Sequence, residues 1–170
     1  MDLNAKIRRV PDFPKPGIEF YDITTVLEDA EAFHEAIDRM KDAVEGFGCD
    51  LLVGLESRGF IFASPIAYAL GKGVHLIRKP GKLPCKTIST SYSLEYGKDS
   101  FEIHEDAVKP GEKCVIVDDL LATGGTVGAT VKLIEQLGGI VSGIVFFIEI
   151  EGLEGRQKIG EYPIVSIVKV

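Results

Sequence analysis

The clearest structural signal in this sequence is the stretch at positions 114–126, Cys-Val-Ile-Val-Asp-Asp-Leu-Leu-Ala-Thr-Gly-Gly-Thr. Its apolar opening is rich in β-branched residues, which is typical of a strand buried on both faces inside a parallel sheet. Asp118 and Asp119 follow at the end of this strand, and a tight glycine loop comes next. From Val127 to Leu137 apolar residues recur at spacings of four, three and three, which predicts a helix. The order of strand, acidic pair, loop and helix predicts an α/β fold.

The loop at positions 123–126, Thr-Gly-Gly-Thr, has the composition of an anion-binding site. Gly124 and Gly125 lack a Cβ atom, so several backbone N–H groups can reach one anion, and the following helix adds the positive end of its dipole. Asp118 and Asp119 would repel a phosphate and suit the hydroxyls of a ribose. A ribose 5-phosphate therefore satisfies both parts; the alternative is an ordinary turn between a strand and a helix. The Walker A and GxGxxG nucleotide motifs are absent.

The same stretch resembles the 5-phosphoribosyl 1-pyrophosphate (PRPP) binding motif of the type I phosphoribosyltransferases, in the form found in those that act on adenine. Four more segments extend the resemblance over nearly the whole chain: Pro-Lys-Pro-Gly at 14–17, Glu-Ser-Arg-Gly-Phe at 56–60, Arg-Lys-Pro-Gly-Lys-Leu-Pro at 78–84 and Tyr-Ser-Leu-Glu-Tyr-Gly at 92–97. The resemblance implies the type I phosphoribosyltransferase fold, with a mostly parallel central sheet flanked by helices, an N-terminal hood and a mobile catalytic flap. It also implies purine salvage, in which 5-phosphoribose moves from PRPP to adenine and gives AMP and pyrophosphate.

The resemblance further implies roles for individual residues. Glu95, in the flap, would approach the purine and help manage its proton, so it is expected to be catalytic together with Asp118 and Asp119. Arg58 and the cationic loop at 78–82 would neutralise pyrophosphate, with an unusual cis peptide between Glu56 and Ser57. Mg²⁺ would be held mainly by PRPP and pyrophosphate oxygens, so no metal-ligating residues are expected. The expected PRPP-binding residues are Arg58, Arg78, Lys79, Lys82, Asp118, Asp119, Ala122, Thr123, Gly124, Gly125 and Thr126.

A separate set of residues is expected to bind the base. Positions 5–26 contain three prolines and several aromatic residues, which predicts an extended, irregular segment. By resemblance this is the hood, in which Phe20 stacks on adenine and main-chain groups around Glu19 and Tyr21 contact its polar edge. Ile150 would form the opposite apolar face. The alternative is that these aromatic residues only anchor the hood to the core.

Length and composition limit the remaining possibilities. With 170 residues, 45% of them hydrophobic, the chain is expected to form a single domain over 1–170, with the hood at about 5–26 and the flap at about 79–100. No apolar run approaches the roughly 20 residues of a membrane span, and the start of the chain lacks the core of a signal peptide, which favours a cytoplasmic protein without membrane association. A net charge of −7 argues against nucleic-acid binding.

Hydrophobic periodicity predicts the other main elements. Apolar residues at helical spacing predict a helix over 30–47, and a second helix is expected over 60–70, with a kink or an early break at Pro65. Short apolar runs predict strands at 51–55, 74–77, 140–150 and 164–170. Positions 83–100 are expected to form a long flap that excludes water.

Two other functions are compatible with the sequence. A transferase for hypoxanthine or guanine would share the PRPP motif, because base choice depends on main-chain groups of the hood. A non-catalytic regulator that senses PRPP would be expected to carry a nucleic-acid-binding extension or a basic face, which this chain lacks. The family resemblance also implies a homodimer.

Overall fold

The computed structural model describes residues 1–94 and 97–170. At its centre lies a five-stranded sheet in which every neighbouring pair of strands is parallel, in the order β4-β3-β7-β8-β9. This confirms the expected α/β class with a parallel central sheet. The strands of this sheet are β3 (Leu51–Leu55), β4 (Gly73–Ile77), β7 (Lys113–Leu121), β8 (Ile140–Glu149) and β9 (Ile164–Lys169).

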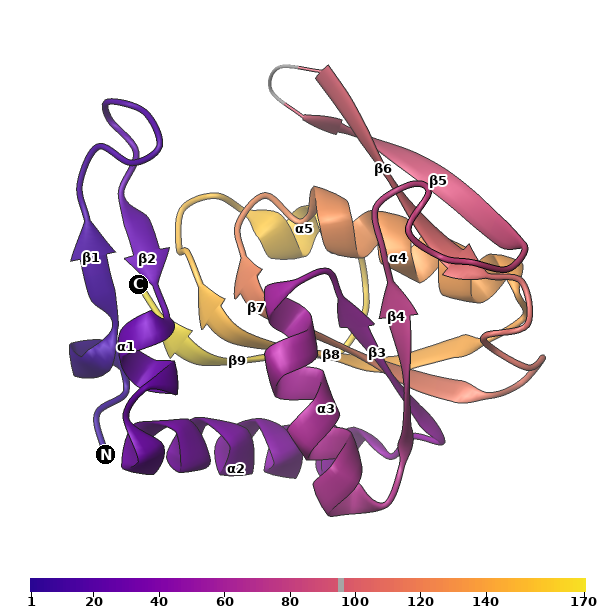
Figure 1. Cartoon of the computed structure of the whole chain (residues 1–170), viewed down its shortest axis with the longest axis horizontal. Coiled ribbons are helices and arrows are strands. Elements are labelled where there is room, and N and C mark those ends of the chain that lie inside the picture. Colours follow the sequence, from indigo (N-terminus) through magenta and orange to yellow (C-terminus); the bar gives the residue numbers. More distant parts are fainter. Residues whose placement is uncertain (95–96) are drawn as a thin grey trace.

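Helices cover both faces of the sheet (Figure 1). Helices α2 (Ala30–Phe47) and α3 (Arg58–Leu70) pack on one face, and α4 (Gly125–Gln136) packs on the other. Among the described residues, no helix is long and apolar enough to cross a membrane. The remaining helices are short: a 3₁₀ turn at Asn4–Lys6, α1 (Thr24–Leu27) and α5 (Gly155–Ile159).

The central strands are buried on both faces because their apolar residues point alternately to two cores. In β3, Leu52 packs with α2 and α3, whereas Leu51 and Val53 pack with α4 on the opposite face. All five residues of β3 are buried. Each such side chain contributes about 1.5–3 kcal/mol when it is fully removed from water, which explains why the sequence of this strand is continuously apolar.

Helix α2 matches its predicted bounds because the sequence carries a capping residue before its first turn and a glycine after its last. The Asp29 side chain caps the first turn by accepting hydrogen bonds from the backbone N–H groups of Glu31 and Ala32. At the other end Gly48 has a φ of +66°, which favours glycine. Between them the buried stripe includes Met40 and Val44.

Helix α3 starts two residues before the predicted position and continues past Pro65 to Leu70, so the expected early break does not occur. Proline at this position removes the hydrogen bond that its N–H would donate to the carbonyl of Ile61. Burial of Phe62 and Ile66 against the sheet offsets this loss.

Two antiparallel hairpins rise beyond the edge at which β3, β4 and β7 end (Figure 1). The first, β1 (Arg8–Val10) with β2 (Phe20–Asp22), lies in the segment expected to form the hood; the chain there is extended as predicted, but its two strands pair in a regular hairpin that was not predicted. The second, β5 (Thr87–Leu94) with β6 (Gly97–His104), corresponds to the expected flap and packs over α4. Regular strand pairing over both segments satisfies backbone groups that an irregular chain would leave to water.

Candidate active site

The register of the sheet brings the predicted motifs to one edge. Gly54 of β3 pairs with Val117 of β7, after which β3 ends at Leu55. Strand β7 continues through Asp118 and Asp119 to Leu121, paired only with β8. The sequence suggested that the acidic pair follows the strand, but Asp118 and Asp119 are the sixth and seventh of the nine residues of β7. Because β3 stops short, the start of α3 lies directly against the two carboxylates.

Gly59 allows this close approach of α3 and β7. A Cβ atom at Gly59 would lie 2.8 Å from Oδ1 of Asp118 and 2.9 Å from the Val117 carbonyl oxygen. Both distances are shorter than side chains tolerate, so any larger residue would push the helix away from the strand. The sequence motif Glu-Ser-Arg-Gly thus contains a packing requirement as well as a charge.

Asp118 and Asp119 are buried, with exposed fractions of 9% and 6%. Oδ1 of Asp118 accepts a hydrogen bond of 2.9 Å from the Asp119 backbone N–H, and Arg58 Nε lies 2.8 Å from Asp119 Oδ2. Burial raises the pKa of both carboxyl groups, and the neighbouring charge of Asp119 raises the pKa of Asp118 further. Arg58 opposes this effect and is the cation that compensates the pair.

A cavity of about 260 Å³ joins the acidic pair to the predicted phosphate loop. Gly124 has a φ of +84° and is the N-cap residue of α4, and the backbone N–H groups of the first turn of this helix lack partners within it. Of the predicted PRPP-binding residues, seven line it: Arg58, Asp118, Asp119, Ala122, Thr123, Gly124 and Thr126.

Glu56 also lines this cavity and contacts several residues of the cationic loop at 78–82. It precedes a cis peptide to Ser57, as the resemblance implied. Its side chain accepts hydrogen bonds from Arg78 Nε (3.0 Å) and from the Lys79 backbone N–H (3.0 Å), and Lys82 Nζ lies 3.2 Å from Oε1. Burial favours a raised pKa for Glu56, but these contacts outweigh it and hold the pKa below its usual value.

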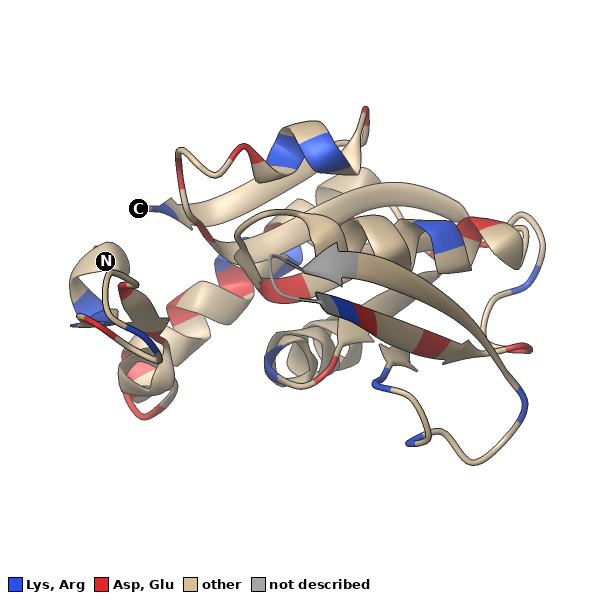
Figure 2. Cartoon of the chain, turned by 90° about the horizontal axis from the view of Figure 1, so that it is seen from above, with Lys and Arg blue, Asp and Glu red and all other residues tan. Residues whose placement is uncertain are grey.

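The Lys79 ammonium group is engaged elsewhere. It forms an ion pair with Asp99 of β6 and lies 5.0 Å from the centroid of the Phe101 ring. Figure 2 shows the loop after β4 running beside the β5–β6 hairpin, and Arg78 pairs with Glu102 through both backbone groups. Arg78, Lys79 and Lys82 therefore contact carboxylates and do not line the cavity that holds the acidic pair.

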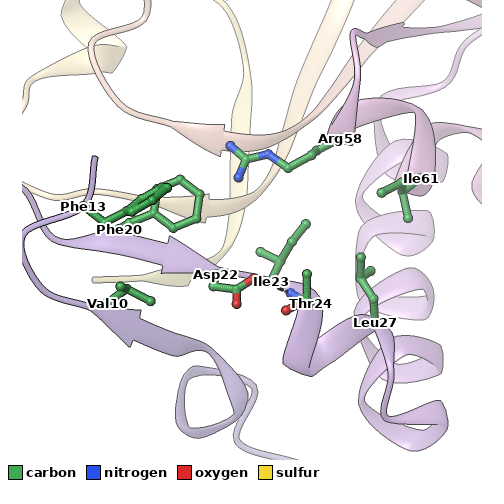
Figure 3. Close-up of a pocket in the computed structure, with 9 residues that line it drawn as sticks. All are labelled: Val10, Phe13, Phe20, Asp22, Ile23, Thr24, Leu27, Arg58 and Ile61. Carbon is green, nitrogen blue, oxygen red and sulfur yellow. Dashed lines mark hydrogen bonds between the residues drawn. The ribbon is translucent and has the colours of Figure 1, made fainter. Parts of the chain in front are cut away.

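A second cavity, of about 480 Å³ and mostly apolar, lies between the first hairpin and α3 (Figure 3). Phe13 and Phe20 meet edge to face with ring centroids 5.2 Å apart. Arg58 projects from α3 toward them, with its Cζ atom 5.4 Å from the Phe20 centroid. Arg58 lines both cavities, which places the aromatic site next to the acidic one.

The other residues predicted to bind the base have different positions. The Tyr21 hydroxyl donates to Glu19 at 2.9 Å, and the Tyr21 ring packs against the core beneath the hairpin. Ile150 follows β8, donates its N–H to the Leu121 carbonyl at 3.0 Å and lines neither cavity. Glu95, the predicted proton-transfer residue, lies outside the described residues.

Sequence reasoning did not select Glu56 or Gly59 as site residues. Both belong to the segment after β3, which repeats the strand, loop and helix order of the phosphate loop. This repetition was the available signal, because ligands of parallel sheets collect at the carboxyl ends of the strands.

At its carboxyl edge the parallel sheet thus carries a buried acidic pair and a glycine loop, beside an aromatic pocket. A family model for the phosphoribosyl transferase domain matches residues 24–168. An adenine phosphoribosyltransferase from Acetivibrio thermocellus is 62% identical over 170 residues, covering 99% of each chain. The chain therefore belongs to the phosphoribosyl transferase family and, within it, to the adenine phosphoribosyltransferases.

Solved structures agree with this assignment. The crystal structure of adenine phosphoribosyltransferase from Thermoanaerobacter pseudethanolicus has a TM-score of 0.97 and 54% identity, covering 99% of this chain and 98% of that one. The enzyme from Saccharomyces cerevisiae was solved with adenine and an imino-altritol bisphosphate. It has a TM-score of 0.91 and 37% identity, and the match covers 98% of this chain and 96% of that one.

Proposed function

We propose that this protein transfers the 5-phosphoribosyl group of PRPP to adenine, forming AMP and pyrophosphate. The observation that carries the proposal is Arg58, which lines both the aromatic cavity and the acidic cavity. A planar base would thus lie against Phe20 and a ribose against the acidic pair, with the guanidinium of Arg58 between them. The relatives named for adenine favour this base over hypoxanthine or guanine.

The reaction breaks the bond from ribose C1 to pyrophosphate and forms a bond from C1 to a ring nitrogen of adenine, which loses a proton. Positive charge develops on the ribose ring and negative charge on the leaving group, so the site must stabilise charge. Asp118 and Asp119 would accept hydrogen bonds from the ribose hydroxyls. The loop from Ala122 to Thr126 would hold the 5-phosphate through backbone N–H groups and threonine hydroxyls. Glu95 would take up the purine proton.

The cationic loop is proposed to serve pyrophosphate. Arg78 and Lys82 already contact Glu56 beside the acidic cavity, so an entering pyrophosphate would compete with this carboxylate for the same cations. Lys79 would have to leave Asp99 to take part. Folding of the β5–β6 hairpin over the site would exclude water, which otherwise hydrolyses PRPP.

Mg²⁺ fits this site as an ion shared with the substrate. Within residues 1–94 and 97–170 there is no cluster of three or more His, Cys, Asp or Glu side chains that could hold a metal alone. PRPP and pyrophosphate oxygens would supply most of its ligands, and the carboxylates of Asp118 and Asp119 would accept hydrogen bonds from water molecules bound to the ion. When bound, Mg²⁺ neutralises charge on the pyrophosphate.

The base site is proposed to include more than the aromatic cavity. Main-chain groups at Glu19 and Tyr21 would contact the polar edge of adenine, which is compatible with the Tyr21 side chain packing toward the core. Ile150 would close the other face of the base. The outcome would be one apolar slot bounded by Phe20 and Ile150.

We also propose a homodimer in the cytoplasm. Ile61 and Tyr68 lie two turns apart on one face of α3 and are 38% and 90% exposed, and Leu76 of the neighbouring β4 is 36% exposed. Such a group of apolar side chains suits a second copy of the chain. All three cysteines are free thiols, as is usual in a reducing compartment. A sedimentation mass equal to one chain would contradict the dimer.

The test uses purified protein with PRPP, Mg²⁺ and adenine. Equal amounts of AMP and pyrophosphate are expected, and chelation of Mg²⁺ should stop their formation. Glu95→Gln should lower kcat strongly with little change in PRPP affinity, whereas wild-type turnover would remove the role given to Glu95. Absence of AMP with the unaltered chain would refute the proposed function.

A further inference from the structure

The short helix α5 lies against the outside of the phosphate loop, and backbone atoms of the two segments touch. A Cβ atom at Gly124 would collide with the Gly155 carbonyl, whose carbon would be 3.2 Å away. One at Gly155 would collide with the Ala122 carbonyl oxygen and would lie 2.8 Å from Leu121 Cδ1. The backbone of the loop therefore packs directly against the backbone of α5 at Gly155, without a side chain between them.

A forked ion pair holds α5 in this place. Arg156 Nε and Nη2 donate to Oε1 and Oε2 of Glu149, each at 2.7 Å. Its Nη1 also donates to the Ile164 carbonyl at 3.0 Å, and Nη2 lies 3.3 Å from the Ser166 hydroxyl. Glu149 is only 8% exposed and ends β8. Because a bidentate Arg–carboxylate pair fixes direction as well as distance, α5 is tied to the carboxyl end of β8 and to the first half of β9.

The position of this ion pair connects it to the site. Glu149 pairs with Leu121 in the sheet register, and Leu121 directly precedes the phosphate loop. The loop contains two consecutive glycines, which lose more conformational entropy on ordering than other residues. Its N–H groups bind an anion well only if they are held in place beforehand.

We propose that Gly155, Arg156 and Glu149 are positioning residues for the phosphate loop. The Arg156–Glu149 pair holds α5, and the backbone at Gly155 supports Ala122 to Gly124 in the arrangement that binds phosphate. This inference rests on the proposed function, which assigns the loop to the 5-phosphate of PRPP. None of these three residues lines the acidic cavity, so they act through the loop and not on the substrate.

The test compares Gly155→Ala and Arg156→Gln with the unaltered chain. Ribose 5-phosphate binding, measured by calorimetry, should weaken about tenfold to a hundredfold, because small misplacements of a binding group have effects of that size. The KM for PRPP should rise in parallel, and the KM for adenine should stay within about twofold. Arg156→Lys, which keeps the charge and loses the fork, should recover part of the affinity.

Matched controls separate this effect from general destabilisation. Gly46→Ala meets no atom within 4 Å, and Arg39→Gln breaks an exposed pair with Glu35 on α2. Both should bind ribose 5-phosphate as the unaltered chain does. If Gly155→Ala does not fold, Arg156→Gln decides the matter by the same readout. Unchanged ribose 5-phosphate affinity, or equal rises in both KM values, would overturn the proposal.

The binding measurement also separates this inference from the proposed function. An unaltered chain that binds ribose 5-phosphate but makes no AMP would refute the transferase, while the comparison of variants would still decide the role of α5. An unaltered chain that does not bind ribose 5-phosphate would overturn the phosphate assignment and the positioning role together.

Discussion

Arg58 Nε forms an ion pair with Oδ2 of Asp119 at 2.8 Å, and this contact joins the start of α3 to the carboxyl half of β7. The guanidinium carbon of Arg58, Cζ, lies 5.4 Å from the centroid of the Phe20 ring. One side chain thus compensates a buried acidic pair and borders the aromatic pocket. Under the proposed function, the base and the ribose would be joined beside this guanidinium.

Replacement of Arg58 tests this arrangement. Arg58→Met removes the cation that compensates Asp119, and we expect kcat/KM for AMP formation to fall by about a hundredfold or more. Steady-state kinetics would measure the loss, and circular dichroism would check the fold. Arg39→Met, which alters a surface ion pair on α2, is the control. Retention of kcat/KM within threefold would contradict the assignment.

Asp118 gives a prediction for stability against pH. Burial and the neighbouring Asp119 raise its pKa above the ordinary 3.8. Its favourable contribution is present below the pKa of the unfolded chain and is lost as pH rises through the folded pKa. Asp118→Asn should therefore gain stability relative to the wild type as pH rises above about 4, while PRPP binding weakens about tenfold to a hundredfold.

Urea unfolding at several pH values, together with calorimetric titration of PRPP, checks this trade-off. A stability difference that does not change with pH would contradict the buried-charge account. Unchanged PRPP affinity would count against the ribose role of Asp118.

Glu56 should show the opposite pH dependence. Burial alone would raise its pKa, but hydrogen bonds from Lys79 N–H, Arg78 and Lys82 lower it below 4.5. Its stabilising contribution is present above the unfolded pKa and is lost as pH falls through the folded value. Glu56→Gln should lower the free energy of unfolding by about 1–2 kcal/mol at pH 7. The difference in unfolding free energy between Glu56→Gln and the wild type should shrink as the pH falls, which urea unfolding at several pH values would measure. A difference that grows in acid would contradict a lowered pKa for Glu56.

Gly59→Ala should separate α3 from β7. The added methyl group would lie 2.8 Å from Asp118 Oδ1 and 2.9 Å from a backbone carbonyl, so we expect a loss of about 1–3 kcal/mol in unfolding free energy. Activity should fall with it, because Arg58 is the adjacent residue. Gly46→Ala in α2 meets no atom within 4 Å and should stabilise the protein slightly. Equal changes in unfolding free energy for Gly59→Ala and Gly46→Ala would show that the close contact between Gly59 and β7 does not affect stability.

Phe20→Ala tests the base pocket. Loss of the ring removes the surface next to Arg58 and Phe13, so the KM for adenine should rise about tenfold while PRPP affinity stays unchanged. Phe20→Leu keeps part of the apolar volume, so its KM for adenine should lie between those of the wild type and Phe20→Ala. A larger change in PRPP affinity than in the KM for adenine would place the base elsewhere.

The regular parts of the fold could be predicted because their signals are local. Helix α2 has a capping Asp29 and a terminal glycine, and β3 is a continuous apolar run, so both were predicted at their observed bounds. Helix α3 was predicted less well, since packing of Phe62 and Ile66 overrides the local effect of Pro65.

The rest depends on contacts between distant positions. The hairpin β1–β2 pairs residues on either side of a loop rich in proline, and nothing local specifies that register. Likewise, the cluster of Arg78 and Lys82 was visible in the sequence, but its carboxylate partner Glu56 lies more than twenty positions earlier. The Asp pair was found because two adjacent carboxylates follow a continuous apolar run, but the sequence did not show that β7 continues past them to Leu121.

The most direct measurement offers adenine, hypoxanthine and guanine separately to the purified protein with PRPP and Mg²⁺, and separates the nucleotide products by chromatography. The arrangement of Arg58 between the aromatic and acidic cavities, with relatives that act on adenine, predicts AMP from adenine and no nucleotide from the other two bases. Formation of IMP or GMP in place of AMP would contradict the adenine site, and no product from any base would contradict the transferase.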